Sequence, residues 1–180
     1  TETRIAEIMP SALPLLMKSP AEVSAPPEGC ICIEDQVYDA GGVRILGLGG
    51  CRKYHPGDFQ YTDRQMRGRI LKMRWPIRKA GGIDILVSHA PAEGLGDSED
   101  VAHWGFPSLR TFLDRYSPGY HVHGHVHMTY GQNIPRTQSY NGTTIINAYE
   151  RYTLEIPDRE VPEKKKNKLI WMNDPPEYAR

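Results

Sequence analysis

Short runs of apolar and β-branched residues, separated by glycine and proline, account for most of this chain. The segments QVYDA (36–40) and VRILGL (43–48) have the composition of strands, and the AGG between them is typical of a hairpin turn. The continuous apolar run at 85–87 lies between a glycine pair and a proline, which predicts a buried strand. Further strands are expected at CICI (30–33), TTIINAY (143–149) and YTLEI (152–156).

Two segments instead place apolar residues three and four positions apart, which indicates helices. The first starts at YTDRQM, where Thr62 and Gln65 form a capping box, and Pro76 is expected to end it. The second, GFPSLRTFLDRYSPG, has Pro107 in its first turn. Its apolar side consists of Leu109, Phe112, Leu113 and Tyr116. A short helix is also expected within residues 1–28, before an irregular proline-rich connection.

The order of these elements predicts the class of fold. Strands alternate with helices and are then followed by a run of strands, which favours an α/β (α+β) architecture. We expect residues 1–157 to form a single domain and residues 158–180, which contain EKKKNK, to form a charged C-terminal tail. With 15 prolines and 17 glycines in 180 residues, many short elements are expected rather than a helical bundle.

Net charge, apolar runs and cysteine content indicate which kinds of partner and which cellular compartment to expect. The formal net charge is zero, so no overall field favours nucleic acid or a membrane surface. No apolar run is long enough to span a bilayer, and no signal-peptide pattern follows Thr1. Three cysteines without a CxxC pair favour a reducing, cytoplasmic setting.

Histidines are the most unusual feature of the sequence, because four of the seven lie in HVHGHVH (121–127). In extended chain His125 and His127 would share one face, and Gly124 lets the earlier pair point elsewhere. His89 closes the buried strand, at the kind of position where α/β sheets keep their sites. Histidine is the commonest metal ligand, so a metal site competes with the alternative of hydrogen-bonded strand histidines. A cupin-like barrel also uses HxH, but the MTYGQ that follows lacks its glutamate.

ILVSHAP followed by HGHVH resembles the last two metal-binding motifs of the calcineurin-like metallophosphoesterases. The connecting stretches LGLGGCRKYHPGDFQYTDRQM, GLGDSEDVAHWGF and TTIINAYERYTLEI resemble a bacterial branch of that family, so the similarity runs from about Pro26 to Ile156. The resemblance implies a β-sandwich flanked by helices that hydrolyses phosphate mono- or diesters with two divalent metal ions (Mn, Fe, Zn or Ni). His89 and His125 would hold one metal, and His127 the other.

The same family also uses a DxH, a GDxxD and a GNH motif in its N-terminal half, and none of them precedes ILVSHAP in this chain. Its first aspartate is Asp35, its first histidine is His55 and its first asparagine is Asn133, so residues 1–34 cannot form these motifs. Three neutral imidazoles give two dications no anionic ligand, so no catalytic residue is assigned and activity of this chain alone is not expected.

Three explanations for this absence stay open. Either the N-terminal half is missing from the sequence, or it comes from another chain, or it was lost in a remnant that binds a partner without catalysis. The last makes a non-catalytic interaction module the alternative to a metallophosphoesterase. A back half on its own would expose the sheet face that the front half covers, which favours self-association.

Secondary candidates surround the histidines. Arg52 follows a strand end and could bind a substrate phosphate, or be an ordinary surface arginine. His103 could line the pocket or cap the next helix, and Asp97 could orient a ligating histidine or cap a loop. Seven basic residues and no acidic one lie between Arg64 and Lys79. They could face a nucleic-acid backbone, although a solvated helix face is the favoured interpretation.

Overall fold

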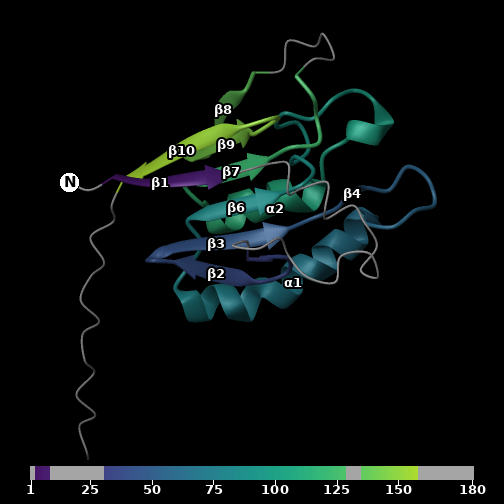
Figure 1. Cartoon of the computed structure of the whole chain (residues 1–180). Coiled ribbons are helices and arrows are strands. Elements are labelled where there is room, and N and C mark those ends of the chain that lie inside the picture. The colour runs from purple at the N-terminus through teal and green to yellow at the C-terminus, as the bar shows by residue number, and fades with distance from the viewer. Residues whose placement is uncertain (1–2, 9–30, 129–134, 158–180) are drawn as a thin grey trace, which may run out of the picture.

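The computed structural model describes residues 3–8, 31–128 and 135–157 (Figure 1). Its elements, in chain order, are β1 (Thr3–Ile8), β2 (Val37–Ala40), β3 (Val43–Leu48), β4 (Cys51–Arg52), β5 (Gln60–Tyr61), α1 (Asp63–Ala80), β6 (Ile85–Ser88), the 3-10 turn η3 (Val101–His103), α2 (Pro107–Tyr116), β7 (Tyr120–His123), β8 (Thr137–Tyr140), β9 (Thr143–Asn147) and β10 (Tyr152–Pro157). Helices alternate with strands before a run of strands, so the expected α/β (α+β) class is confirmed.

A six-stranded sheet with the order β2-β3-β6-β7-β9-β8 forms the centre of the fold. Strands β3, β6, β7 and β9 are parallel to one another, and the hairpins β2-β3 and β8-β9 add one antiparallel strand at each edge. The register pairs Ser88 with Leu48 on one side and with His123 on the other. The carboxyl ends of the parallel strands therefore meet at one edge of the sheet, and the segments that follow them are neighbours.

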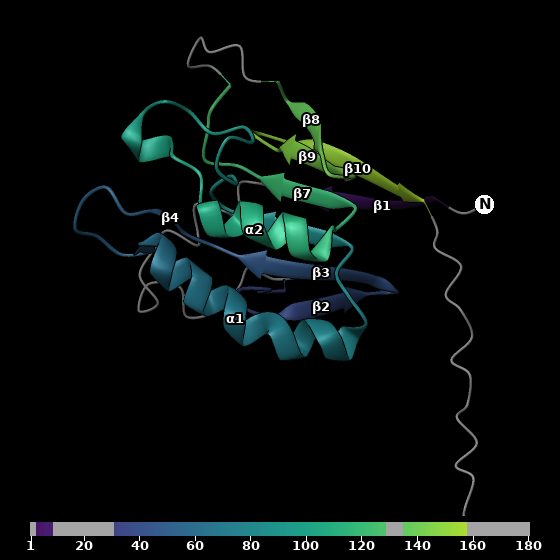
Figure 2. The same ribbon diagram turned by 180° about the vertical axis from the view of Figure 1, so that it is seen from behind.

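The two faces of this sheet are covered differently. Helices α1 and α2 lie side by side over one face (Figure 2), where Leu46 and Leu86 pack with helix residues such as Phe112 in the larger core. Burying one such side chain stabilises the fold by about 1.5–3 kcal/mol. The opposite face carries Ile85 and Val122 and the rest of a smaller core, against which Leu154 of β10 packs.

Helix α1 begins as expected but ends later. Thr62 and Gln65 form the predicted capping box. The prediction that Pro76 ends the helix is wrong, because α1 continues through it to Ala80. Proline removes a single backbone donor, and buried Ile77 anchors the turn that follows it. The helix ends at Gly81, whose φ of 77° suits glycine, and the Gly82 N–H donates to the Ile77 carbonyl.

The N-terminal expectation is also wrong where it can be compared. Residues 3–8 form β1, which pairs antiparallel with β10, and not a helix. A partner strand almost 150 positions away decides this conformation, so no local pattern could have indicated it. Residues 9–28 of that expectation lie outside the described residues, as does the predicted tail at 158–180.

Two smaller differences concern strands. Residues 31–33 of CICI form no strand, and Ile31 is 58% exposed; the neighbouring Glu34 makes an isolated bridge to Gly47. The short strands β4, β5 and β8 were not expected, because two to four residues give little periodicity. Within the described ranges, no helix has both the length and the apolar character needed to cross a membrane.

Candidate metal centre

The two histidine motifs lie side by side at the carboxyl edge of the sheet. His89 directly follows β6, and His125 and His127 follow β7, which is the neighbouring parallel strand. The Gly124 N–H donates to the His89 carbonyl at 3.1 Å, which joins the two loops beyond the strand ends. This is the edge where parallel α/β sheets commonly place their sites.

The rings of His89 and His125 are close, with centroids 4.7 Å apart. The extended conformation in which His125 and His127 would share a face does not occur, because β7 ends at His123 and His125 has a φ of +66°. The His127 ring instead packs on the Tyr149 ring, and the two ring centroids are 4.6 Å apart. Among the described residues, no group of three or more His, Cys, Asp or Glu side chains is arranged to hold a metal ion. The chain thus brings two of the three predicted ligands into ring contact without forming a complete site.

His89 is buried, and its two ring nitrogens are unpaired among the described residues, as expected of a metal ligand without its metal. Its side chain is 6% exposed, and neither ring nitrogen has a hydrogen-bond partner within the described part of the chain. Burial and, as smaller contributions, the nearby His125, His123 and His127 together lower the pKa of His89 to about 3. The ring is therefore neutral at physiological pH, as a metal ligand must be. Leaving a buried polar atom unpaired costs about 1–3 kcal/mol, which a bound ion would offset.

His125 is oriented by a backbone carbonyl. Its Nε2 lies 2.7 Å from the Ala102 oxygen, and with Nε2 as the donor the lone pair of Nδ1 stays available. Histidines that bind metals commonly donate their other nitrogen to a carbonyl in this way. Burial also lowers the pKa of His125. These features fit a ligand role for the residue.

His103 lies beside His125, with ring centroids 5.0 Å apart. Its Nδ1 pairs with the Asp100 carboxylate at 2.7 Å, and Asp100 also accepts the Ala102 N–H as the N-cap of η3. The structure therefore places His103 beside His125, and His103 does not cap α2, whose N-cap is Phe106 with no side-chain hydrogen bond.

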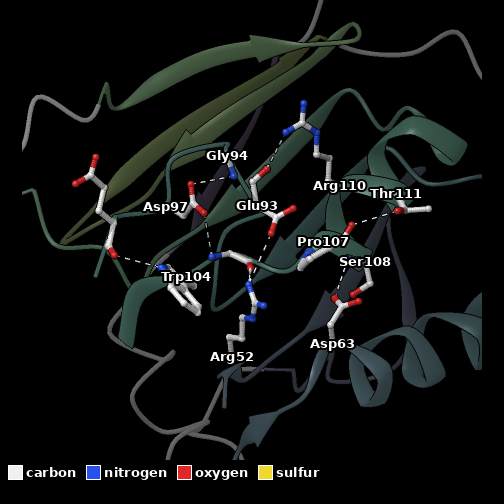
Figure 3. A network of polar contacts seen from close by, with 12 residues as sticks. Arg52, Asp63, Glu93, Gly94, Asp97, Trp104, Pro107, Ser108, Arg110 and Thr111 are labelled. Carbon is white, nitrogen blue, oxygen red and sulfur yellow. Dashed lines mark hydrogen bonds and ion pairs between the residues drawn. The ribbon is translucent and has the colours of Figure 1, made fainter. Parts of the chain in front are cut away.

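Arg52, the predicted phosphate-binding residue, contacts the loop between β6 and α2. Figure 3 shows its guanidinium reaching toward Glu93, and the Nη1–Oε1 distance is 3.7 Å. The same nitrogen lies 3.4 Å from the Gly105 carbonyl, and the guanidinium carbon is 5.0 Å from the centre of the Trp104 ring. Arg52 thus joins β4 to this loop, and its side chain remains 29% exposed.

Asp97 caps the same loop (Figure 3). Its two carboxylate oxygens accept the N–H groups of Gly94 at 2.9 Å and Gly105 at 3.2 Å. Of the two interpretations of Asp97, loop capping is the one that matches these contacts.

The first two histidines of HVHGHVH belong to the interior of the sheet. His121 and His123 lie on β7 and are almost fully buried. The His121 Nε2 is 2.8 Å from the Ser88 hydroxyl, which donates to the Ala90 carbonyl. Burial lowers the pKa of both imidazoles, that of His123 to about 4. His121 and His123 therefore pack as neutral residues behind the loop that carries His125 and His127.

Asn147 and Tyr149 lie near the metal-centre histidines, and the sequence analysis did not predict a role for either residue. Asn147, the last residue of β9, donates to the Val126 carbonyl at 2.8 Å and accepts the Tyr149 N–H at 3.0 Å. It thereby connects the loop that carries His127 to the aromatic residue on which His127 packs. Its position could have indicated this role, because Asn147 is the last residue of a strand that ends at the same edge of the sheet as the strand before His89.

Comparisons with known proteins support the motif resemblance over part of the chain. No family model matches it. Two UPF0046 proteins of Caenorhabditis elegans are each 33% identical to it, over 103 and 128 residues. The human protein named metallophosphoesterase domain-containing protein 1 is 29% identical over 119 residues, which is 64% of this chain. The chain is thus a homologue of these proteins at about 30% identity.

The coverage of these relatives is partial. The matches to the two nematode proteins cover 56% and 66% of this chain. They cover only 25% and 41% of the length of those proteins, and the human match covers 35% of the human protein. A solved crystal structure aligns with 68% of the chain and 49% of its own length, at a TM-score of 0.51 and 19% identity, and so shares its fold.

Proposed function

We propose that this chain, a partial homologue of the metallophosphoesterase-domain proteins, contributes metal-binding histidines to a metal-dependent phosphoesterase. The substrate class would be phosphate mono- or diesters. The name of the human relative supports the hydrolase class, and the resemblance of SHAP and GHxH to metal-binding motifs supports the assignment of ligands.

One observation supports this proposal most strongly. His89 is buried with both ring nitrogens unpaired, and it touches the ring of His125, whose far nitrogen faces a backbone carbonyl. A buried imidazole pair of this kind suits a divalent cation of Mn, Fe, Zn or Ni.

In the proposed arrangement His89 and His125 would hold one ion and His127 a second. Divalent ions at these residues would supply Lewis-acid chemistry for phosphate-ester hydrolysis. Arg52 and His103 would face the substrate. Arg52 would exchange its contact with the Glu93 carboxylate for a hydrogen bond to a phosphate oxygen. Three neutral imidazoles leave the charge of two cations unbalanced, so carboxylate ligands from other residues would complete the centre.

A second function, a non-catalytic interaction module, has its own supporting observation. On the sheet face opposite the helices, β10 leaves Val43, Ile45, Val87 and Tyr120 only partly buried. Such a face could hold a second copy or a complementing chain. Light scattering would then show a dimer or complex, and a monomer at micromolar concentration would contradict this function.

Metal binding is the direct test of the first proposal. The purified chain, dialysed against Mn²⁺ or Zn²⁺, is expected to retain metal by mass spectrometry, and the double variant His89→Ala/His125→Ala is expected to lose it. His55→Ala is the matched control, because His55 lies in an exposed loop where it bonds Gln60. Equal metal contents in the double variant and the control, with both folded by circular dichroism, would reject the assignment.

A further inference from the structure

A groove with several arginines lies between α1 and α2, on the side of the molecule that Figure 2 presents. Arg67 and Arg74 of α1 and Arg115 of α2 line it, and it has a volume of about 290 Å³. A second hollow of about 670 Å³ shares Arg74 and Arg115 and adds Lys72, Trp75 and Arg78. We call the two together the helix groove. It contains none of the histidines of the candidate metal centre.

Among the described residues, no ion pair engages a guanidinium group of the helix groove. In the part of the chain that the structure describes, Arg67, Arg74 and Arg78 make no ion pair, whereas Arg44 pairs with Asp84 and Arg69 with Glu34 and Asp35. This contrast leaves an excess of positive charge on a chain whose net charge is zero.

One acidic residue, Asp63, lines the groove beside its arginines, and Asp114 lies on α2 next to Arg115 in the chain. The Asp63 carboxylate accepts the Ser108 N–H at 2.9 Å. The Asp114 carboxylate accepts the Tyr140 hydroxyl and the Asn141 amide at 2.9 and 2.8 Å. Neither contact neutralises an arginine of the groove.

The groove also contains a buried hydroxyl with no hydrogen-bond partner in the described part of the chain. Ser108 lines the hollow and is 6% exposed, and its Oγ makes no hydrogen bond among the described residues. An unpaired buried hydroxyl costs about 1–3 kcal/mol, so an oxygen-rich ligand in the groove would remove an existing penalty. This observation is independent of the arginines and indicates a ligand with hydrogen-bond acceptors.

Exposed apolar side chains accompany the positive charge. Trp75 is 72% exposed and Leu71 is 49% exposed, on the outer side of α1 between its basic residues. Arg67 and Arg78 are eleven positions apart, which corresponds to about 16 Å along a helix. The groove therefore has room for several successive phosphates, with an aromatic face beside them.

We propose that the helix groove binds single-stranded nucleic acid. Arg67, Arg74 and Arg115 bind backbone phosphates, the Ser108 hydroxyl donates to a phosphate oxygen, and a base stacks on Trp75. Positively charged grooves with exposed aromatic rings are the common means of binding single strands. Arginine suits phosphate because its planar fork donates two hydrogen bonds at once. An anionic membrane is less compatible, because only two large apolar side chains could enter it and the basic surface is concave.

The test measures binding to labelled 15-nucleotide single strands, RNA and DNA, by fluorescence anisotropy at about 50 mM salt. A chelator is present throughout, so that failure of the metal proposal has no influence on the result. Micromolar affinity is expected, with salt dependence. No binding up to about 100 μM would overturn the proposal, and so would binding to phosphatidylserine vesicles in the absence of oligonucleotide binding.

Variants localise the binding. Arg74→Gln/Arg115→Gln is expected to weaken binding at least tenfold and to reduce the salt slope by about 1.4, since each single-strand phosphate contact contributes about 0.7. Lys53→Gln/Arg136→Gln removes the same charge outside the groove and should change affinity less than twofold. Trp75→Ala should cost about 5- to 150-fold through lost stacking. Equal losses in the two double variants would overturn the proposal, as would unchanged affinity in both Arg74→Gln/Arg115→Gln and Trp75→Ala.

Discussion

Burial of a neutral histidine in the central sheet predicts a specific loss of stability in acid. His121 is fully buried on β7, and desolvation holds the pKa of its imidazole well below 6.5. In the unfolded chain the same group titrates near 6.5. Below that pH the unfolded state binds a proton that the native state excludes, so stability falls as the pH is lowered.

The size of this stability loss depends only on the pKa of His121 in the unfolded chain, because the pKa in the native protein lies well below 6.5. At pH 5.5 the unfolded imidazole is about ten to one protonated, which corresponds to about 1.4 kcal/mol of lost stability from this residue alone. At pH 7.5 the contribution is negligible, because the imidazole is then almost entirely neutral in both states. Other buried histidines add to the acid sensitivity of the wild type, so a comparison with a variant is needed to isolate His121.

His121→Gln is the appropriate variant, because the glutamine amide can replace the Nε2 contact with the Ser88 hydroxyl without titrating. Urea unfolding of both proteins at pH 7.5, 6.5 and 5.5 gives the free energy of unfolding at each pH. The loss between pH 7.5 and 5.5 is expected to be about 1.4 kcal/mol smaller in the variant, whatever its stability at pH 7.5. Equal losses in the two proteins would refute a native pKa far below 6.5.

Two further predictions concern the framework and the chemistry. The Arg44 side chain donates to Asp84 through Nε and Nη2 at 2.8 and 2.6 Å, with exposures of 15% and 22%, so Asp84→Ala should cost about 2–3 kcal/mol by urea unfolding. Exposed Asp58→Ala is the control, and a loss for Asp84→Ala as small as that of the control would contradict this estimate. The 180-residue chain alone is expected to hydrolyse an aryl phosphodiester no faster than metal in buffer, because the described residues provide no complete ligand group. A metal-dependent rate that His89→Ala removes would show that further carboxylates are unnecessary.

The sequence alone determined the features that depend on neighbouring residues. The hairpin at 37–48, the buried strand ending at Ser88 and both helix starts follow from local periodicity, turn residues and capping. The placement of His89 directly after a strand was also readable. Because parallel strands end at one edge, its proximity to the second motif could be anticipated, and the 4.7 Å contact with His125 agrees with it. The role of these histidines as ligands remains a prediction.

Tertiary structure decided what depends on residues that are distant in the chain. Residues 3–8 became a strand because β10 pairs with them, and α1 continued past Pro76 because Ile77 is buried against the sheet. His125 adopted a positive φ in a loop that Asn147 supports from β9. Such outcomes depend on long-range pairing and packing energies, which exceed the preferences of about 1 kcal/mol or less that most local sequence expresses.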